Sequence, residues 1–310
     1  MERRRNWRMK KHGENKLEVL WSGGYDSTFM LCLLAKTKNV TIQPYYLDIH
    51  RYIRNEEKRA IKEIFAILKK KKDLKAKILP VKIVKEEYTQ PSNEVIEAWK
   101  KYRDEPYKIG GQQVRIAEFS KTHHGICWGQ ERYLETPGHM TQLLLDKGNW
   151  KFTEDWVGYF DKEDCDADVY TLFGHLVAPV AKYTELMMWE KIKEWGYEDV
   201  FQHIRFCYYP VDGKSCGMCV PCQVKLRQKM NLLFTDKAIE DGKVMQQLKL
   251  QEEKRNGDIF TIPELFMMYN NSVYKKDMIG KRYGGSEYFL REAEKEIEKY
   301  RNEFDALYKK

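Results

Sequence analysis

The sequence contains no hydrophobic run close to the roughly 20 residues that a membrane-spanning helix needs. Its basic N-terminus is not followed by the apolar segment of a secretory signal. Hydrophobic residues nevertheless make up 42% of the 310 residues, which supports a sizeable core and argues against wholesale disorder. We therefore expect a folded cytoplasmic protein of one large domain or two smaller ones, without a membrane partner.

A disulfide framework is also not indicated, because the seven cysteines are an odd number and four of them crowd together. The four are Cys207, Cys216, Cys219 and Cys222, with the spacing C-x8-C-x2-C-x2-C. Two-residue gaps let neighbouring thiolates turn onto one ion, and four thiolates suit a tetrahedral structural Zn²⁺. An iron–sulfur cluster is the alternative interpretation of this spacing. The remaining cysteines are expected to be small core residues: Cys32, Cys127 and Cys165.

Positive charge is present in excess and is concentrated at the N-terminus. The net charge is +8, and the first sixteen residues hold seven basic residues against two acidic ones. The basic residues are Arg3, Arg4, Arg5, Arg8, Lys10, Lys11 and Lys16. Such an arm, residues 1–16, could bind nucleic acid, but a solvated terminus is the favoured interpretation.

Short apolar segments alternate with amphipathic ones through most of the chain. Strands are expected at 17–21, 40–48, 77–84 (with a break at Pro80) and 125–129, and helices at 27–35, 55–70 (capped by Asn55), after Ser92, 114–122, 136–146 and 184–195. This alternation predicts an α/β fold, a parallel sheet with helices on both faces. Pro44 lies inside the second strand and favours a bulge or an edge position there.

The domain organisation follows from the segments that interrupt this alternation. We expect an α/β domain at 17–200 with an aromatic and acidic insertion at about 147–172, then a zinc-binding element at 201–230. Residues 231–310 are charged, helical in pattern and free of repeats, and are expected to form a C-terminal extension.

A glycine-rich loop, Ser22-Gly23-Gly24-Tyr25-Asp26-Ser27, lies between the first strand and the first helix. The glycines allow the backbone to approach an anion, and the helix N-terminus adds positive potential. The hydroxyls of Ser22 and Ser27 can donate to phosphate oxygens, whereas Asp26 could hold a Mg²⁺ that bridges phosphates or could orient the loop. No lysine follows the glycines and the pattern G-x-G-x-x-G is absent, so neither the kinase and GTPase loop nor the dinucleotide loop is predicted.

The six residues resemble the signature of the PP-loop, or N-type, ATP pyrophosphatases. The resemblance implies a fold of the adenine nucleotide alpha hydrolase-like (HUP) type, and cleavage of ATP between its α- and β-phosphates with transfer of AMP to a substrate oxygen. It implies catalytic roles for Ser22, Asp26 and Ser27. It further implies that the loop binds ATP together with Leu20, Trp21 and Asp48.

The loop and the cysteines together resemble the 7-cyano-7-deazaguanine synthase (QueC) family of queuosine biosynthesis. The similar segments are 45–60, 179–196, CYYP at 207–210 and CGMCVPC at 216–222. By this resemblance the zinc is structural, and ATP adenylates a carboxylate such as 7-carboxy-7-deazaguanine. Ammonia then displaces AMP to give an amide, and a second ATP converts the amide into a nitrile. Lys182 lies at the family's lysine position and is expected to contact phosphate or the acyl-adenylate.

Two segments depart from the family pattern, 107–115 and 129–140, and they stand where the substrate is expected to bind. The reaction could therefore stop at the amide, or join the activated deazaguanine to another amine, including one on a protein. The alternatives are an RNA-modifying sulfurtransferase with an iron–sulfur cluster and a non-catalytic nucleotide-binding partner in an assembly. A homodimer, or a protein partner bound through the C-terminal extension, is compatible with each. His123-His124 could act as a base, but we expect a pair of histidines at a helix end. The acidic residues 161–168 could bind a metal, but we expect a solvated loop.

Overall fold

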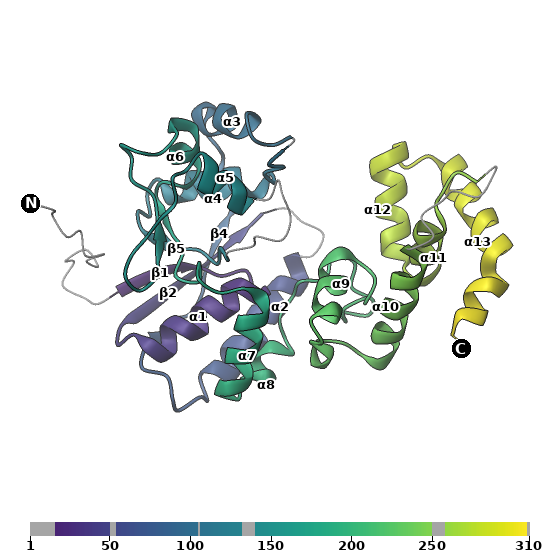
Figure 1. Cartoon of the computed structure of the whole chain (residues 1–310), viewed down its shortest axis with the longest axis horizontal. Coiled ribbons are helices and arrows are strands. Elements are labelled where there is room, and N and C mark those ends of the chain that lie inside the picture. The colour runs from purple at the N-terminus through teal and green to yellow at the C-terminus, as the bar shows by residue number, and fades with distance from the viewer. Residues whose placement is uncertain (1–15, 50–53, 105, 132–139, 250–257, 309–310) are drawn as a thin grey trace, which may run out of the picture. The chain divides into compact units, whose positions relative to one another are not determined.

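The computed structural model describes residues 16–49, 54–104, 106–131, 140–249 and 258–308. The chain divides into two compact units, one ending at Ile204 and the other beginning at Arg205 (Figure 1). The basic arm up to residue 15 and the expected helix start at Thr136-Pro137 lie outside the described residues.

The first unit is built on a parallel sheet. The sheet has the strand order β3-β2-β1-β5-β8, and β4 also pairs with β2. The strands are β1 Lys16–Leu20, β2 Thr41–Asp48, β3 Lys77–Ile78, β4 Lys82–Lys85, β5 Ile126–Cys127 and β8 Leu176–Val177. Since β1 lies between β2 and β5, with Leu20 opposite Tyr45 and Val19 opposite Cys127, the loop after β1 leaves the middle of the sheet.

Helices cover both faces of this sheet (Figure 1). On one face lie α1 Tyr25–Thr37, α2 Arg54–Leu68, α7 Glu185–Trp195 and α8 Glu198–Phe201, and on the other lie α3 Asn93–Lys100, α4 Gln112–Ser120, α5 Met140–Asp146 and α6 Ala167–Phe173. A short 3-10 helix, η1 Glu86–Thr89, follows β4. The predicted α/β architecture is confirmed. The cap expected at Asn55 is wrong, because α2 is already helical at Arg54.

Pro44 lies in an inner strand, not at an edge. The carbonyl of Ile42 accepts from Leu79 N at 2.9 Å, so alternate residues of β2 direct their backbone groups toward β3 and β4, Pro44 among them. The chain interrupts its pairing with β2 at Pro80, between β3 and β4. The side-chain amide of Gln43 is buried at this interruption. It donates hydrogen bonds to the carbonyls of Pro44 and Pro80, each at 3.0 Å. Pro44, which has no backbone N–H to donate, therefore lies where the hydrogen bonds between β2 and its neighbours β3 and β4 are interrupted.

The predicted insertion at 147–172 is part of the core of the first unit. It forms a hairpin of β6 Lys151–Phe152 and β7 Gly158–Tyr159, and continues into α6. Trp150 and Phe160 are buried in the same hydrophobic cluster as Leu172 of α6 and Trp128 after β5.

The second unit combines the cysteine segment with the C-terminal helices. Its helices are α9 Val220–Arg227, η2 Asn231–Leu233, α10 Asp236–Lys249, α11 Ile262–Asn270, α12 Ser272–Tyr283 and α13 Glu287–Leu307. The four clustered cysteines belong to one hydrophobic core with Phe260, Leu265, Phe266 and Phe304. The zinc-binding element and the extension, predicted as separate parts, therefore fold as one unit.

A histidine pair lies where β5 and β8 begin. His124 Nδ1 and His175 Nδ1 are 2.8 Å apart, whereas His123 stacks on Phe119 with ring centroids 3.9 Å apart. Burial lowers the pKa of His175 below its ordinary value, and the neighbouring His124 lowers it further. The two histidines thus follow the end of α4, as expected, and His124 in addition contacts His175 ahead of β8.

The histidine pair predicts a stability loss in mild acid. Because the folded-state pKa of His175 is depressed, the unfolded chain binds the proton first as the pH falls below about 6.5. The free energy of unfolding should therefore decrease from about pH 6.5 downward, by less than about 1 kcal/mol since His175 is only half-buried. Urea unfolding of the wild type and of His175→Gln between pH 8 and pH 5 measures this. An identical slope in both proteins would contradict it.

Candidate functional site

The glycine-rich loop connects β1 to α1 and is supported from two directions. Gly23 has φ +72°, and a Cβ there would lie 3.2–3.3 Å from Ile61, Ala60 and the carbonyl of Glu57 in α2. A Cβ on Gly129, after β5, would lie 2.8 Å from the backbone nitrogen of Ser27. The loop is therefore held closely between α2 and the segment that follows β5.

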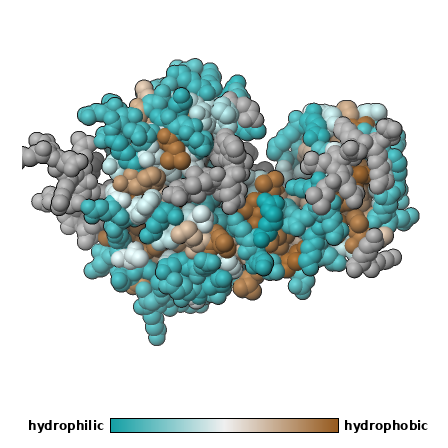
Figure 2. Space-filling model, viewed as in Figure 1, coloured by the Kyte–Doolittle hydropathy of each residue, from teal (hydrophilic) through white to brown (hydrophobic). Residues whose placement is uncertain are grey.

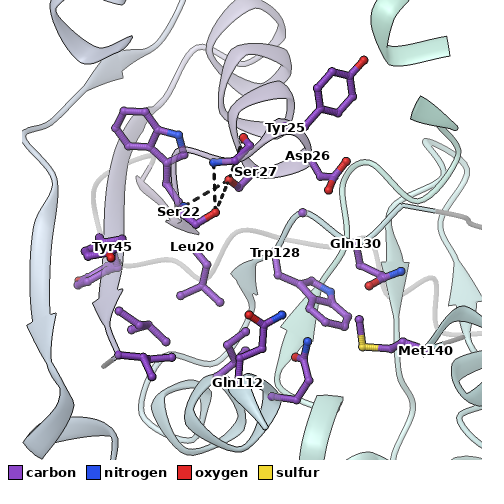
Figure 3. A pocket seen from close by; sticks show the side chains of 18 residues that line it. Leu20, Ser22, Tyr25, Asp26, Ser27, Tyr45, Gln112, Trp128, Gln130 and Met140 are labelled. Carbon is purple, nitrogen blue, oxygen red and sulfur yellow. Dashed lines mark hydrogen bonds between the residues drawn. The ribbon is translucent and has the colours of Figure 1, made fainter. Parts of the chain in front are cut away.

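The two loop serines meet within this turn (Figure 3). Their Oγ atoms are 3.1 Å apart, Ser22 N donates to Ser27 Oγ at 3.3 Å, and Gly24 N donates to Ser22 Oγ at 3.3 Å. Gly24 is the N-cap of α1, and no side chain caps the helix. Two hydroxyls thus converge at an uncapped helix N-terminus, which is a favourable place for an anion.

A cavity of about 300 Å³ opens beside the loop (Figure 3). It is lined by Leu20, Trp21, Ser22, Gly24, Tyr25, Asp26, Ser27, Tyr45, Tyr46, Leu47, Ile49, Gln112, Gln113, Ile116, Trp128, Gly129, Gln130 and Met140. Both segments expected to bind the substrate contribute to the lining, 107–115 through α4 and 129–140 through its described ends.

Two predicted site residues lie elsewhere in the structure. Asp48 pairs with Lys58 at 2.6 Å and with Arg54 at 3.9 Å, and it does not line the cavity. Lys182 is exposed, with its Nζ 5.1 Å from the ring centroid of Tyr183, and it does not line the cavity either. Both predictions rested on the resemblance to a known family, which does not determine where a side chain points in this chain.

Three carboxylates meet at the loop, and the sequence analysis had named one of them, Asp26, as a possible metal ligand. Oxygen atoms of Asp26, Glu131 and Glu185 all lie within 4.8 Å of one another. The three residues come from the first turn of α1, the segment after β5 and the first turn of α7. Carboxylate oxygens are the ligands that hard divalent cations such as Mg²⁺ prefer, so the group could hold such an ion.

Tyr25 connects the loop to α7. Its hydroxyl donates to the carbonyl of Glu185 at 2.9 Å, and its ring meets Phe201 edge-on at 5.6 Å. Burial raises the pKa of Tyr25 well above its ordinary range, and the charges of Glu185, Asp26 and Glu131 raise it further. Tyr25 therefore stays protonated and keeps the first turns of α1 and α7 together.

The described part of the cavity wall holds one charged side chain. Among the described residues that line it, Asp26 carries a charge and none is lysine or arginine. Backbone N–H groups, hydroxyls and a bound metal ion can each offset part of the charge of a polyphosphate.

The four cysteines of the second unit form a compact group. Cys219 Sγ lies 3.4 Å from Cys222 Sγ and 3.9 Å from Cys207 Sγ, and Cys216 Sγ lies 3.9 Å from Cys222 Sγ. All four are buried and none forms a disulfide. A Zn–S distance of about 2.3 Å in a tetrahedron places sulfur atoms about 3.8 Å apart, which these separations match.

The backbone around the cysteines supports an anionic cluster. Cys216 N donates to Cys207 Sγ at 3.3 Å, and Cys219 N donates to Cys216 Sγ at 3.3 Å. Gly217 has φ +75°, and a Cβ there would lie 1.8 Å from the carbonyl oxygen of Ala238 in α10. The cysteine turn is thus packed directly on α10, and glycine is required at this contact.

The isolated cysteines behave as core residues. Cys32 and Cys127 are fully buried, and burial raises the pKa of both thiols to about 12. Cys165 is half-buried against the core, and burial raises its pKa to about 11. None of the three is therefore an activated thiol.

The comparisons with known proteins give no relative. No protein-family model matches the chain, and no curated protein or solved structure matches it.

None of the described helices is both long and apolar enough to cross a membrane. The face of the molecule in Figure 2 is mostly hydrophilic.

Proposed function

We propose that this protein is an AMP-forming ATP-dependent ligase of the PP-loop type that activates a carboxylate resembling 7-carboxy-7-deazaguanine. The observation that carries the proposal is the loop of two serines and two glycines, fixed at the wall of a cavity and adjacent to three carboxylates. The parallel sheet, with the loop leaving its middle strand, supports a HUP-type fold.

The donor set fits Mg²⁺ because it consists of hard carboxylate oxygens that lie close enough together to contact one ion. Asp26, Glu131 and Glu185 would hold the ion. When bound, it would offset the negative charge of the triphosphate and of the departing pyrophosphate.

The chain's own groups would orient the reactants. The hydroxyls of Ser22 and Ser27 and the N–H groups of the turn would donate to the β- and γ-phosphates. The substrate carboxylate would attack the α-phosphorus, and the bond to pyrophosphate would break, leaving an acyl-adenylate. Ammonia would then attack the acyl carbon, and AMP would leave with the bonding electrons to give the amide. A second activation, at the amide oxygen, followed by loss of AMP and protons, would give the nitrile.

The zinc site is part of the same proposal. The four thiols fit one tetrahedral ion, and their separations of 3.4–3.9 Å favour it over an iron–sulfur cluster, whose several iron atoms require wider ligand spacing. Since the cysteines lie in the hydrophobic core of the second unit, the zinc would be structural. A cytoplasmic location agrees with reduced thiols.

The sulfurtransferase and the non-catalytic partner are therefore less favoured. An amide as the final product stays an alternative to the nitrile, and an amine on a protein stays an alternative to ammonia as the nucleophile. The basic arm, on which a nucleic-acid partner depended, lies outside the described residues.

The test is an assay with purified protein, ATP, Mg²⁺, ammonium and 7-carboxy-7-deazaguanine. AMP and pyrophosphate should form in equal amounts and only when the acid is present, and mass spectrometry should detect the amide or the nitrile. Omission of ammonium separates adenylation from amide formation. ADP as the product, or AMP formation without the acid, would overturn the proposal.

A further inference from the structure

The cavity wall carries two buried polar groups that the proposed function does not use. Gln113 and Trp128 are each only 5% exposed, and both line the cavity. Gln113 Oε1 and Trp128 Nε1 have no hydrogen-bond partner among the described residues. Buried polar atoms in folded proteins are nearly always paired, so two unpaired ones on residues that line the same cavity are candidates for contacts with a ligand.

We propose that Gln113 and Trp128 recognise the heterocycle of the carboxylate substrate, an inference that rests on the proposed function. Gln113 Oε1 would accept a hydrogen bond from a ring N–H or amino group, and Trp128 Nε1 would donate one to a carbonyl or ring nitrogen. A ligand that offers both a donor and an acceptor on a small planar frame is a purine-like base. An aliphatic carboxylate would leave both protein groups unpaired.

The rest of the wall suits a flat, largely apolar ring. Leu20 and Met140 lie beside the cavity with Trp128 (Figure 3), and Ile116 also lines it. The Trp128 ring stacks on Phe173 with the ring centroids 5.5 Å apart, which fixes the direction of its N–H. Gln113 comes from α4 and Trp128 from the segment after β5. A planar ligand between them is therefore contacted from two elements, while its carboxylate remains free to meet the loop.

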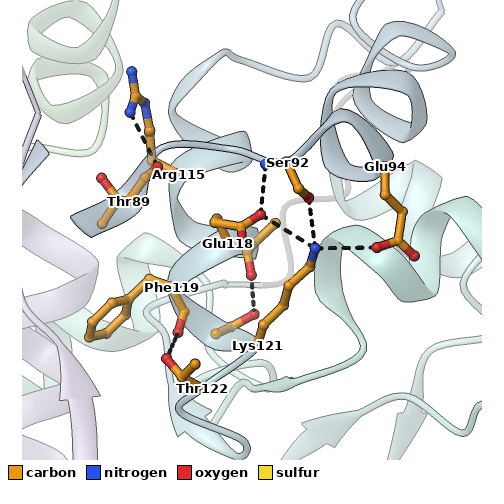
Figure 4. Close-up of polar contacts among 10 residues, drawn as sticks. Thr89, Ser92, Glu94, Arg115, Glu118, Phe119, Lys121 and Thr122 are labelled. Atoms are coloured by element: carbon orange, nitrogen blue, oxygen red, sulfur yellow. Dashed lines mark hydrogen bonds and ion pairs between the residues drawn. The ribbon is translucent and has the colours of Figure 1, made fainter. Parts of the chain in front are cut away.

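The helix that carries Gln113 is fixed from its other side (Figure 4). Arg115 donates to Glu86 Oε1 at 2.8 Å and to the carbonyl of Thr89 at 3.2 Å. Glu118 accepts from Ser92 N at 2.9 Å.

Lys121 extends this network and donates to Ser92 Oγ at 2.8 Å. These contacts join α4 to η1 and to the N-terminus of α3, so that the face bearing Gln112, Gln113 and Ile116 is held against the cavity. A recognition group held on a rigid helix loses little freedom when the ligand binds.

Two conservative substitutions test the inference, Gln113→Met and Trp128→Phe, because each removes the hydrogen-bonding group and keeps most of the volume. Each should raise the KM for the deazaguanine acid roughly tenfold. The KM for ATP should change less than about twofold, although the adenine of ATP offers similar hydrogen-bonding edges. Matched controls are Gln142→Met on an exposed face of α5, and Trp150→Phe, which has the same 5% exposure and a likewise unpaired N–H outside the cavity.

Isothermal titration of the acid into the ATP-free protein separates this inference from the proposed function. Binding that the two cavity variants weaken and the controls do not would support the inference even if no AMP forms. Unchanged KM and binding in folded Gln113→Met and Trp128→Phe would overturn the inference while acid-dependent AMP formation by the wild type stands. A rise in the KM for ATP in place of the KM for the acid would also overturn it, since the groups would then contact adenine.

Discussion

Replacement of Asp26 by asparagine is expected to lower the rate of acid-dependent AMP formation on the order of 10³-fold, while the protein stays folded. Asp26 is the one charged side chain among the described residues that line the cavity. Its carboxylate lies close to the carboxylates of Glu131 and Glu185. Its neutralisation should weaken Mg²⁺ binding and leave the pyrophosphate charge without compensation. The measurement is the initial rate of AMP release at increasing Mg²⁺ concentrations.

The proximity of the three carboxylates predicts how variants of the other two residues behave. Glu131→Gln and Glu185→Gln should also shift the Mg²⁺ dependence to higher concentrations. Asp155→Asn, an 82% exposed carboxylate 3.9 Å from Lys38, should leave the rate unchanged. Normal activity of Asp26→Asn at low Mg²⁺ would contradict a metal role, and equal loss in Asp155→Asn would show that the effect is not local.

Substitution of Cys216 by serine is expected to unfold the second unit. Structural zinc sites contribute roughly 10–16 kcal/mol of apparent binding free energy, so the loss of one of four thiolates removes more stability than a small helical unit possesses. Zinc measured by plasma mass spectrometry should fall from about one ion per chain to near zero. Hydrogen exchange should show loss of protection in α10 and α11, whose side chains share the core with the cysteines.

The metal content itself decides between the two interpretations of the cysteines. Cys165→Ser is the matched control, because this thiol belongs to the core of the first unit, and the variant should retain zinc and protection. Iron and sulfide in anaerobically purified protein, with absorbance near 400 nm, would contradict the zinc proposal and favour the sulfurtransferase.

The fold of the first unit could be predicted because the residues that begin and end its strands and helices lie within a few positions of those elements in the sequence. Thr184 caps α7 through its side chain and Gly196 ends it in the left-handed conformation, as such residues should. The glycine-rich loop could be predicted for the same reason, since its two glycines and two serines lie within six consecutive residues. The composition of residues 147–172 indicated an insertion, but it could not show that Trp150 and Phe160 are buried in the core of the first unit.

The site was less predictable because its chemistry is assembled across the chain. Asp26, Glu131 and Glu185 are far apart in sequence and meet only because α1, α7 and the segment after β5 reach the same edge of the sheet. The sequence contained a signal, acidic residues in the first turns of α1 and α7 and one after β5, but it cannot specify a distance. Gln113 and Trp128 become candidates only when burial and missing partners are known.

The gap in the sheet at Pro44 and Pro80 has a consequence for how the chain folds. A parallel strand that slips by one residue turns every side chain to the opposite face. In β2 such a slip would withdraw Tyr45 and Leu47 from the cavity wall. It would also bring a proline without an N–H opposite a strand that requires a donor, and the Gln43 amide would lose its two acceptors. The interruption therefore disfavours a misaligned pairing of β2 and favours the alignment in which the cavity can form.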